Sequence, residues 1–200
     1  MSLHQYYIIY KPFQVLSQFT SENNKPCLKD FFDVPKDVYP VGRLDFDSEG
    51  LLLLTNDRSL NHRLLHPGFA HERGYRVQVE GLITNEALQQ LSSGVTIQVD
   101  GKPYRTAPGK ASRLAEHNVI PDRNPPIRFR KHIPTSWIKL VITEGKNRQV
   151  RKMTAATGFP TLRLIRFSLQ GLTLDPMLPG DMIEMNQNDA YGKLGLQTHI

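Results

Sequence analysis

A single cysteine, Cys27, occurs in the 200 residues, so the chain cannot form an internal disulfide bond. Neither this cysteine nor the seven histidines show the spacing of a zinc site, and we therefore expect no bound metal. No apolar run approaches the roughly 18 to 20 residues that cross a membrane. A basic and then apolar leader is also missing before the strand-like run that starts at Tyr6. These absences favour a cytoplasmic protein that works without a membrane or a metal ion.

Positive charge is in excess and is unevenly distributed. The net charge is +6, with 39% hydrophobic and 22% charged residues, which suits one domain with a substantial core or two small lobes. The segment from Arg123 to Arg166 holds eleven Lys or Arg residues and one acid, Glu144, a net +10, so the remainder nets about −4. A basic segment of this length favours a nucleic-acid backbone as the partner. An ordinary solvated helix face is the alternative.

An acidic loop leads into the most apolar run of the chain, Leu51–Leu54. A short apolar run bounded by Gly50 and Asn56 is typical of a buried strand. The loop is then held at the edge of the core and can present a carboxylate rigidly to a cleft. A turn with solvated acids is the simpler alternative. The loop opens at Gly42, and its charged residues are Arg43, Asp45, Asp47 and Glu49.

Hydrophobic periodicity predicts strands interrupted by short helices. Lys11–Phe13 is predicted as a bend with Lys11 at its tip, either solvated or bound to a phosphate. The residues after Asn186 are polar and are expected to fray. The predicted strands are 6–10, 15–19, 51–54, 74–80, 136–143 and 162–169, and the predicted helices run from an N-cap at Asp57 to Pro67, over 85–91 and over 146–157.

Three aromatic residues, Phe129, Trp137 and Phe167, lie among the cations of the basic segment. Aromatic rings next to positive charge can stack on unpaired bases. Trp137 lies in a strand pattern, so a position in the hydrophobic core is preferred to stacking on a base.

Several motifs, taken together and in order, resemble the RsuA-type ribosomal RNA pseudouridine synthases. The resemblance runs from about Tyr6 to Glu184 and is specific because the motifs keep the family order and spacing. Two further segments, 123–128 and 133–137, resemble the RluE branch, which modifies large-subunit ribosomal RNA. The motifs are Lys11-Pro12, Gly42-Arg43-Leu44-Asp45, Asp47-Ser48-Glu49-Gly50-Leu51, Tyr75 in its strand, and Glu144-Gly145-Lys146-Asn147-Arg148-Gln149-Val150-Arg151-Lys152-Met153.

The resemblance implies an α+β fold in which a long, mixed, mostly antiparallel sheet is flanked by helices and has a central active-site cleft. It implies one catalytic domain over residues 1–200, with a core at about 6–185 and without the N-terminal S4 RNA-binding module of many relatives. It implies isomerisation of uridine to pseudouridine in large-subunit (23S) ribosomal RNA, without a cofactor or metal. We also expect a monomer.

The resemblance also assigns the catalytic roles. Asp45 matches the family aspartate, which either attacks the sugar or removes a proton beside the anomeric carbon. Such a carboxylate must stay ionised in a closed pocket, so it needs a cation, for which Arg151 is the first candidate and Arg148 the second. Tyr75 matches the tyrosine that packs under the base and assists proton transfer at the new carbon–carbon bond.

The RNA is expected to contact a set of cationic side chains, with Arg43 holding the flipped nucleotide or its phosphate. Two other hypotheses compete with the isomerase: a non-catalytic RNA-binding protein that uses the same basic face, and a nucleoside hydrolase. The first does not explain Asp45 together with Tyr75, and the second needs another acid positioned for water. The expected RNA-binding residues are Lys11, Arg43, Arg128, Arg130, Lys146, Arg148 and Lys152.

Overall fold

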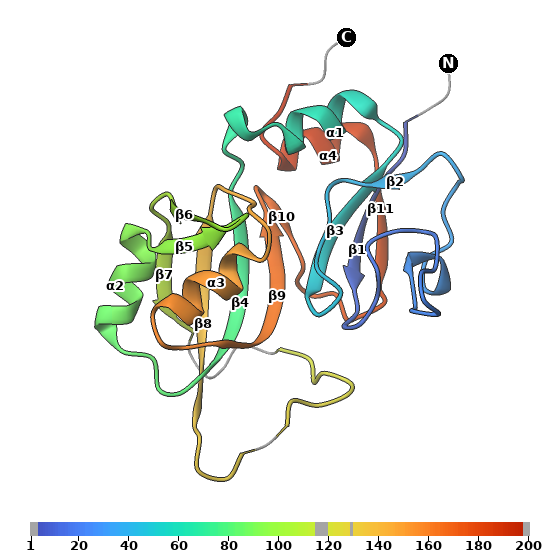
Figure 1. The fold of residues 1–200 in the computed structure, drawn as a ribbon. Coiled ribbons are helices and arrows are strands. Elements are labelled where there is room, and N and C mark those ends of the chain that lie inside the picture. Colours follow the sequence, from blue (N-terminus) through green and yellow to red (C-terminus); the bar gives the residue numbers. More distant parts are fainter. Residues whose placement is uncertain (1–3, 115–119, 129, 198–200) are drawn as a thin grey trace. The chain divides into compact units, whose positions relative to one another are not determined.

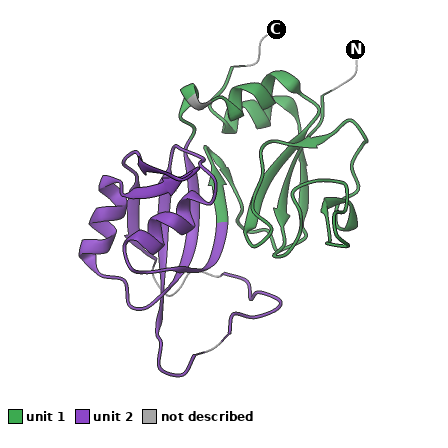
Figure 2. Cartoon of the chain, viewed as in Figure 1, with its two compact units in different colours: residues 1–71, 166–200 green, residues 72–165 purple. Residues whose placement is uncertain are grey.

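The computed structural model describes residues 4–114, 120–128 and 130–197, with the elements labelled in Figure 1. They form two compact units, which Figure 2 colours separately. Unit 1 combines residues 1–71 with 166–200, and unit 2 is the continuous segment 72–165. Unit 2 is therefore an insertion in the chain of unit 1.

Unit 1 is built on two strands that are buried along their whole length, β1 and β3. They pair antiparallel from Tyr6 opposite Thr55 to Lys11 opposite Gly50, and β11 pairs antiparallel with the other side of β1. Burial on both faces explains why Leu51–Leu54 is uniformly apolar and does not alternate. The elements are β1 Tyr6–Lys11, β2 Tyr39–Pro40, β3 Glu49–Thr55, β10 Leu172–Thr173, β11 Met182–Met185, α1 Arg58–Leu65, α4 Gln187–Lys193 and two short 3-10 turns, Leu28–Asp30 and Pro67–Phe69.

Asp57 connects three elements of unit 1. As predicted, it caps α1, where its Oδ1 accepts the N–H of Leu60 at 3.0 Å. Its Oδ2 accepts the hydroxyls of Tyr6 in β1 at 2.8 Å and of Tyr191 in α4 at 2.7 Å. Burial followed by the nearby carboxylate raises the pKa of Tyr191 to about 12. Burial and the same carboxylate also raise the pKa of Tyr6, and the pKa of Asp57 is lowered because its hydrogen bonds outweigh burial, so at neutral pH the carboxylate is ionised and both tyrosines are protonated.

The helix α4 shows that the prediction of a frayed C-terminal segment was wrong. The side chain of Asn186 caps this helix by accepting the N–H of Asp189 at 2.8 Å. Ala190, Tyr191 and Leu194 are all at most 5% exposed. Three buried contacts in a polar segment are enough to hold a short helix that has little stability alone.

Unit 2 consists of antiparallel strands covered by two helices. The strand order is β4-β8-β7, and β5 and β6 form a separate hairpin. Helices and antiparallel strands in both units confirm the α+β class. The elements are β4 Arg73–Glu80, α2 Asn85–Ser93, β5 Thr96–Val99, β6 Lys102–Arg105, β7 Lys110–Arg113, β8 Thr135–Ile142, α3 Gln149–Ala156 and β9 Thr161–Leu169, which starts in unit 2 and ends in unit 1.

The two faces of the unit 2 sheet differ in character. On one face, alternate residues of β8 such as Leu140 pack in a core with Val77, Leu91 of α2 and Met153 of α3. Side chains alternate along a strand, so the residues between them point to the other face. These are mostly polar or cationic, and they include Arg76 and Gln78 of β4 and Trp137 and Lys139 of β8. Trp137 is half-buried and does not belong to the core, contrary to the preferred prediction.

Candidate active site

The backbone around Asp45 is fixed within unit 1. Asp45 is half-buried and lies four residues before β3. The hydroxyl of Ser17 donates to the carbonyl of Leu44 at 2.8 Å and accepts its N–H at 3.0 Å. On the other side, the N–H of Ser48 donates to the carbonyl of Asp45 at 3.0 Å. Hydrogen bonds thus fix the backbone on both sides of Asp45, and presentation of its carboxylate to a cleft stays a prediction.

Gly50 allows β3 to approach the last part of β9. Its φ of +110° lies in a region that side chains disfavour, and a Cβ atom there would be 2.3 Å from the carbonyl oxygen of Arg166. The Nε of Arg166 donates to the carbonyl of Leu51 at 2.8 Å, which fixes this approach. A glycine directly after the acidic loop is therefore required by packing as well as by the turn.

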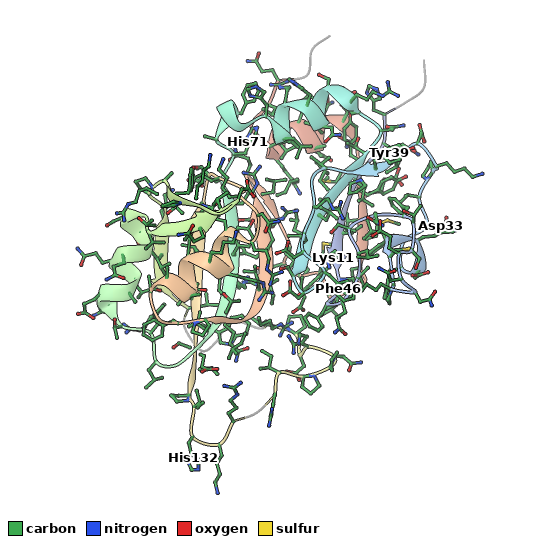
Figure 3. The ribbon with its side chains drawn as sticks, in the orientation of Figure 1. Lys11, Asp33, Tyr39, Phe46, His71 and His132 are labelled. Atoms are coloured by element: carbon green, nitrogen blue, oxygen red, sulfur yellow. The ribbon has the colours of Figure 1, made fainter. Side chains whose placement is uncertain are left out.

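Lys11 lies close to the same loop but is fully buried, so the expectation of a lysine at an exposed tip was wrong. It is the last residue of β1, opposite Gly50 of β3. Its Nζ donates to the carbonyls of Val15 at 2.7 Å and Pro12 at 3.0 Å. Figure 3 labels Lys11 and Phe46, which both belong to unit 1. With no exposed surface, the ammonium group holds the chain bend and is not placed to contact a phosphate.

The charge of Lys11 is set by opposing effects. Burial is the largest and lowers its pKa from 10.5 to about 7. The carboxylates of Glu49, Asp47 and Asp45 oppose this shift, whereas the charge of Arg166 adds to it. The acidic loop therefore supplies part of the stabilisation of a buried lysine, and protonation of Lys11 adds positive charge near Asp45.

The pH dependence of folding is expected to report this lysine. Between pH 7 and about pH 10, Lys11 is protonated in the unfolded chain but not in the folded chain. The contribution of Lys11 to stability therefore rises with pH across this window. This contribution is lost as the pH falls through 7. Relative to Lys11→Met, the wild type should gain on the order of 1 kcal/mol per pH unit between about pH 7 and about pH 9. Denaturant unfolding of both proteins at each pH measures this gain. Parallel pH profiles would rule out a buried, deprotonating lysine.

Tyr75 is in β4 of unit 2, opposite Leu140 of β8. Its side chain is 9% exposed and packs at the border of the unit 2 core, which includes Val77. A ring held in this way has little freedom to lose when a ligand contacts its exposed part. Its role under the base stays a prediction.

Glu144, the single acid of the basic segment, shapes the loop between β8 and α3. Its carboxylate accepts the hydroxyl of Tyr104, the N–H of Ala107 at 3.0 Å and the side-chain amide of Gln149 at 2.8 Å. Burial would raise the pKa of Glu144, but these hydrogen bonds outweigh it and keep the pKa below its ordinary value. Glu144 was not predicted to have a role, although its position as the one acid among eleven cations is a signal in the sequence.

The cations of this loop have different environments. Lys146 is exposed and its Nζ lies 5.1 Å from the centre of the Tyr104 ring. The helix predicted from residue 146 begins only at Gln149, because Arg148 is left-handed with φ 51° and ψ 33°. Arg148 therefore cannot share a helical face with Arg151 and Lys152, which are half-buried in the first turn of α3.

The remaining predicted RNA contacts are Arg43, Arg128 and Arg130. Arg43 of unit 1 is exposed and donates to the Gln18 side chain at 3.3 Å. Arg128 and Arg130 are exposed in the segment between β7 and β8, where Arg130 forms an ion pair with Glu80 at 3.0 Å. The predicted catalytic and RNA-binding residues are thus divided between the units. Unit 1 contains Lys11, Arg43 and Asp45, and unit 2 contains Tyr75, Arg128, Arg130, Lys146, Arg148, Arg151 and Lys152. The predicted stacking residue Phe129 lies outside the described residues.

Residues 4–114, 120–128 and 130–197 contain no group of three His, Cys, Asp or Glu side chains arranged to hold a metal ion. Within the same ranges, no helix has the length and apolar character needed to span a bilayer.

Comparison with known proteins identifies a consistent set of relatives. Residues 5–156 match the family described as RNA pseudouridylate synthase. The chain is 46% identical over 179 residues to ribosomal large subunit pseudouridine synthase E of Vibrio vulnificus, covering 90% of this chain and 74% of that protein. It is 47% identical over 174 residues to the protein of the same name from Xanthomonas axonopodis, covering 86% and 89%. It is 35% identical over 195 residues to ribosomal large subunit pseudouridine synthase B of Bacillus subtilis, covering 97% and 73%.

The fold is also similar to solved structures. A crystal structure described as a pseudouridylate synthase superposes with a TM-score of 0.77 at 26% identity, covering 97% of this chain and 75% of that one.

Proposed function

Because this chain belongs to the RNA pseudouridylate synthase family, we propose that it isomerises a uridine of large-subunit ribosomal RNA, with Asp45 as the reacting carboxylate and without a cofactor. The observation that carries the choice of RNA is the 45–47% identity to proteins named for the large ribosomal subunit. The Gly42-Arg43-Leu44-Asp45 motif and the fixed backbone around Asp45 support the choice of carboxylate.

The reaction breaks the bond between N1 of uracil and C1′ of ribose and forms a bond between C5 and C1′. The proton on C5 moves to solvent or a base, and N1 gains a proton, so atoms and charge balance without an oxidant. A carboxylate can act by attacking C1′ or by removing the neighbouring proton on C2′. Both routes need an ionised Asp45. Both are faster if the carboxylate is already oriented before the reaction, because no entropy is then lost in positioning it.

A cation must stabilise this carboxylate when water is excluded. Of the two proposed arginines, Arg151 is half-buried on a helix, whereas Arg148 is exposed on a left-handed turn. Desolvation strengthens an ion pair, so Arg151 suits the partner of Asp45 and Arg148 suits a phosphate. Tyr75, packed against the core of unit 2, suits the ring under the base, and its hydroxyl is proposed to assist the loss of the C5 proton.

Affinity for RNA is proposed to come from exposed cations of unit 2. Arg128, Lys146 and Arg148 are exposed, and the segment that contains them has a net charge of +10. Phosphate neutralisation by Lys and Arg is the main sequence-independent source of affinity for nucleic acid. The base contacts that choose one uridine then act within this charged surface.

The test uses unmodified transcripts of large-subunit and small-subunit ribosomal RNA incubated with the protein. We expect one pseudouridine in the large-subunit transcript, mapped by chemical labelling and primer extension, and none in the small-subunit transcript. Modification of the small-subunit transcript alone would overturn the choice of substrate. Uracil released as free base would indicate a hydrolase.

A further inference from the structure

The polar face of the unit 2 sheet is hollowed by a pocket that the catalytic assignment does not use. Its volume is about 1270 Å³, and all the residues that line it belong to unit 2. Gln78 of β4 and Trp137 of β8 are opposite each other across the strand pair, and both line the pocket. The segment between β7 and β8 supplies further lining side chains, namely Ile120, Asp122, Arg123, Pro126 and Ile127.

The aromatic ring of Trp137 lies beside positive charge in this pocket. The guanidinium carbon of Arg163 lies 6.0 Å from the centre of the Trp137 ring. Arg163 is 5% exposed, and it donates to the carbonyl of Pro121 in the β7–β8 segment at 2.8 Å. Arg113 and Arg123 also line the pocket, against a single acid, Asp122, so the lining carries a net positive charge.

Neutral polar groups lie beside the indole ring. The side-chain amide of Gln78 donates to the hydroxyl of Thr135 at 3.0 Å, and both residues line the pocket. Amide and hydroxyl groups next to an aromatic ring can read the hydrogen-bonding edge of an unstacked base. The combination of ring, amide, hydroxyl and cations is the chemistry of single-stranded nucleic-acid recognition.

The size of the pocket argues against a small molecule as its occupant. Small-molecule sites usually enclose about 300 to 1,000 Å³. This pocket is larger and open, and its lining combines three arginines with apolar side chains, so a polymer with phosphates and bases fits better than a compact metabolite. A cationic lining also disfavours a basic peptide.

We propose that this pocket binds an unstacked base, with its phosphate, of a single-stranded RNA segment outside the isomerised uridine, and that Trp137 stacks on that base. The proposal rests on the proposed function because it takes RNA as the substrate. It assigns to unit 2 a binding site that is separate from the residues given catalytic roles. Such a site adds affinity for flanking sequence and selects transcripts in which a neighbouring nucleotide is unpaired.

Trp137 is the only tryptophan of the chain, so its fluorescence reports directly on the pocket. The probes are a mixed-sequence single-stranded RNA of about eight nucleotides, within the usual range of single-strand sites, a duplex RNA of the same length, and inorganic phosphate. We expect saturable quenching by the single-stranded RNA and little change with the duplex or with phosphate. Equal quenching by the duplex or by phosphate would overturn the proposal, because charge alone would then explain the signal.

Three variants separate stacking from folding. Trp137→Leu should weaken the affinity for single-stranded RNA about tenfold, measured by anisotropy of labelled RNA, and Trp137→Phe should recover most of this loss. Phe159→Leu is the matched control, because Phe159 is a half-buried aromatic residue of unit 2 that packs against the core and does not line the pocket. It should bind RNA as the wild type does. Wild-type affinity in Trp137→Leu would overturn the proposal.

These titrations need no turnover. The proposed RNA-binding pocket can therefore be ruled out while the isomerase activity is confirmed. Conversely, the isomerase assignment can be ruled out while the pocket still binds RNA.

Discussion

Isomerase activity is expected to fall by at least about a thousandfold in Asp45→Asn, a loss of about 4 kcal/mol of transition-state stabilisation. An amide is almost the same size as a carboxylate but neither attacks the sugar nor accepts a proton, so both mechanisms proposed for Asp45 stop. The loop should keep its shape because Ser17 and Ser48 hold it through the backbone and not through the Asp45 side chain. Single-turnover formation of pseudouridine measures the loss, and RNA affinity and thermal unfolding verify the fold.

Asp47→Asn is the matched control for this experiment. Asp47 belongs to the same loop, is half-buried like Asp45, and has no catalytic role in the proposal. We expect it to keep activity within about tenfold of the wild type. Asp45→Asn turnover within the same tenfold range would remove Asp45 from the mechanism, and a selective loss in Asp47→Asn would transfer the role to that residue.

Gly50→Ala is expected to destabilise unit 1 by about 3 kcal/mol or more, at the upper end of the usual cost of a single substitution. The new methyl group would lie 2.3 Å from the carbonyl oxygen and 2.7 Å from the nitrogen of Arg166, and these are backbone atoms that cannot rotate away. The φ of +110° adds strain. Relief requires β3 to separate from the end of β9, which would also break the hydrogen bond from Arg166 to Leu51.

Gly145→Ala provides the comparison, since a Cβ atom there has nothing within 4 Å. It should change the free energy of unfolding by no more than about 0.5 kcal/mol. Denaturant unfolding of the wild type and both variants measures the difference. Equal stability of the two variants would contradict the close approach of β3 to the backbone of Arg166.

Local signals in the sequence predicted the parts of the fold that depend on neighbouring residues. The buried strand at Leu51–Leu54 and the cap at Asp57 were both predicted, because an apolar run and a capping side chain act over a few residues. The family motif placed Asp45 in a loop before this strand, and the structure shows how Ser17 fixes that loop. Ser17 is 27 residues from Leu44, and no periodic pattern marks such a contact.

The predictions that were wrong depend on contacts between distant segments. Lys11 is buried because carbonyls of Pro12 and Val15 and nearby carboxylates replace water around its ammonium group, although a lysine before a proline usually indicates an exposed turn. Trp137 fits the alternating pattern of a β-strand, but this pattern does not show which face of the sheet is covered by helices. The start of α3 was misplaced because Arg148 is left-handed, which is uncommon for a residue other than glycine.

The insertion of unit 2 within unit 1 has a consequence for the growing polypeptide on the ribosome. Residues 72–165 are contiguous, so unit 2 can fold as soon as they have emerged, since domains generally fold as units during synthesis. Unit 1 must wait, because β11 and α4 follow unit 2 in the chain and are therefore made later. Until then, one edge of β1 lacks its partner and Asp57 lacks the hydroxyl of Tyr191. The unit that carries Asp45 is therefore completed after unit 2.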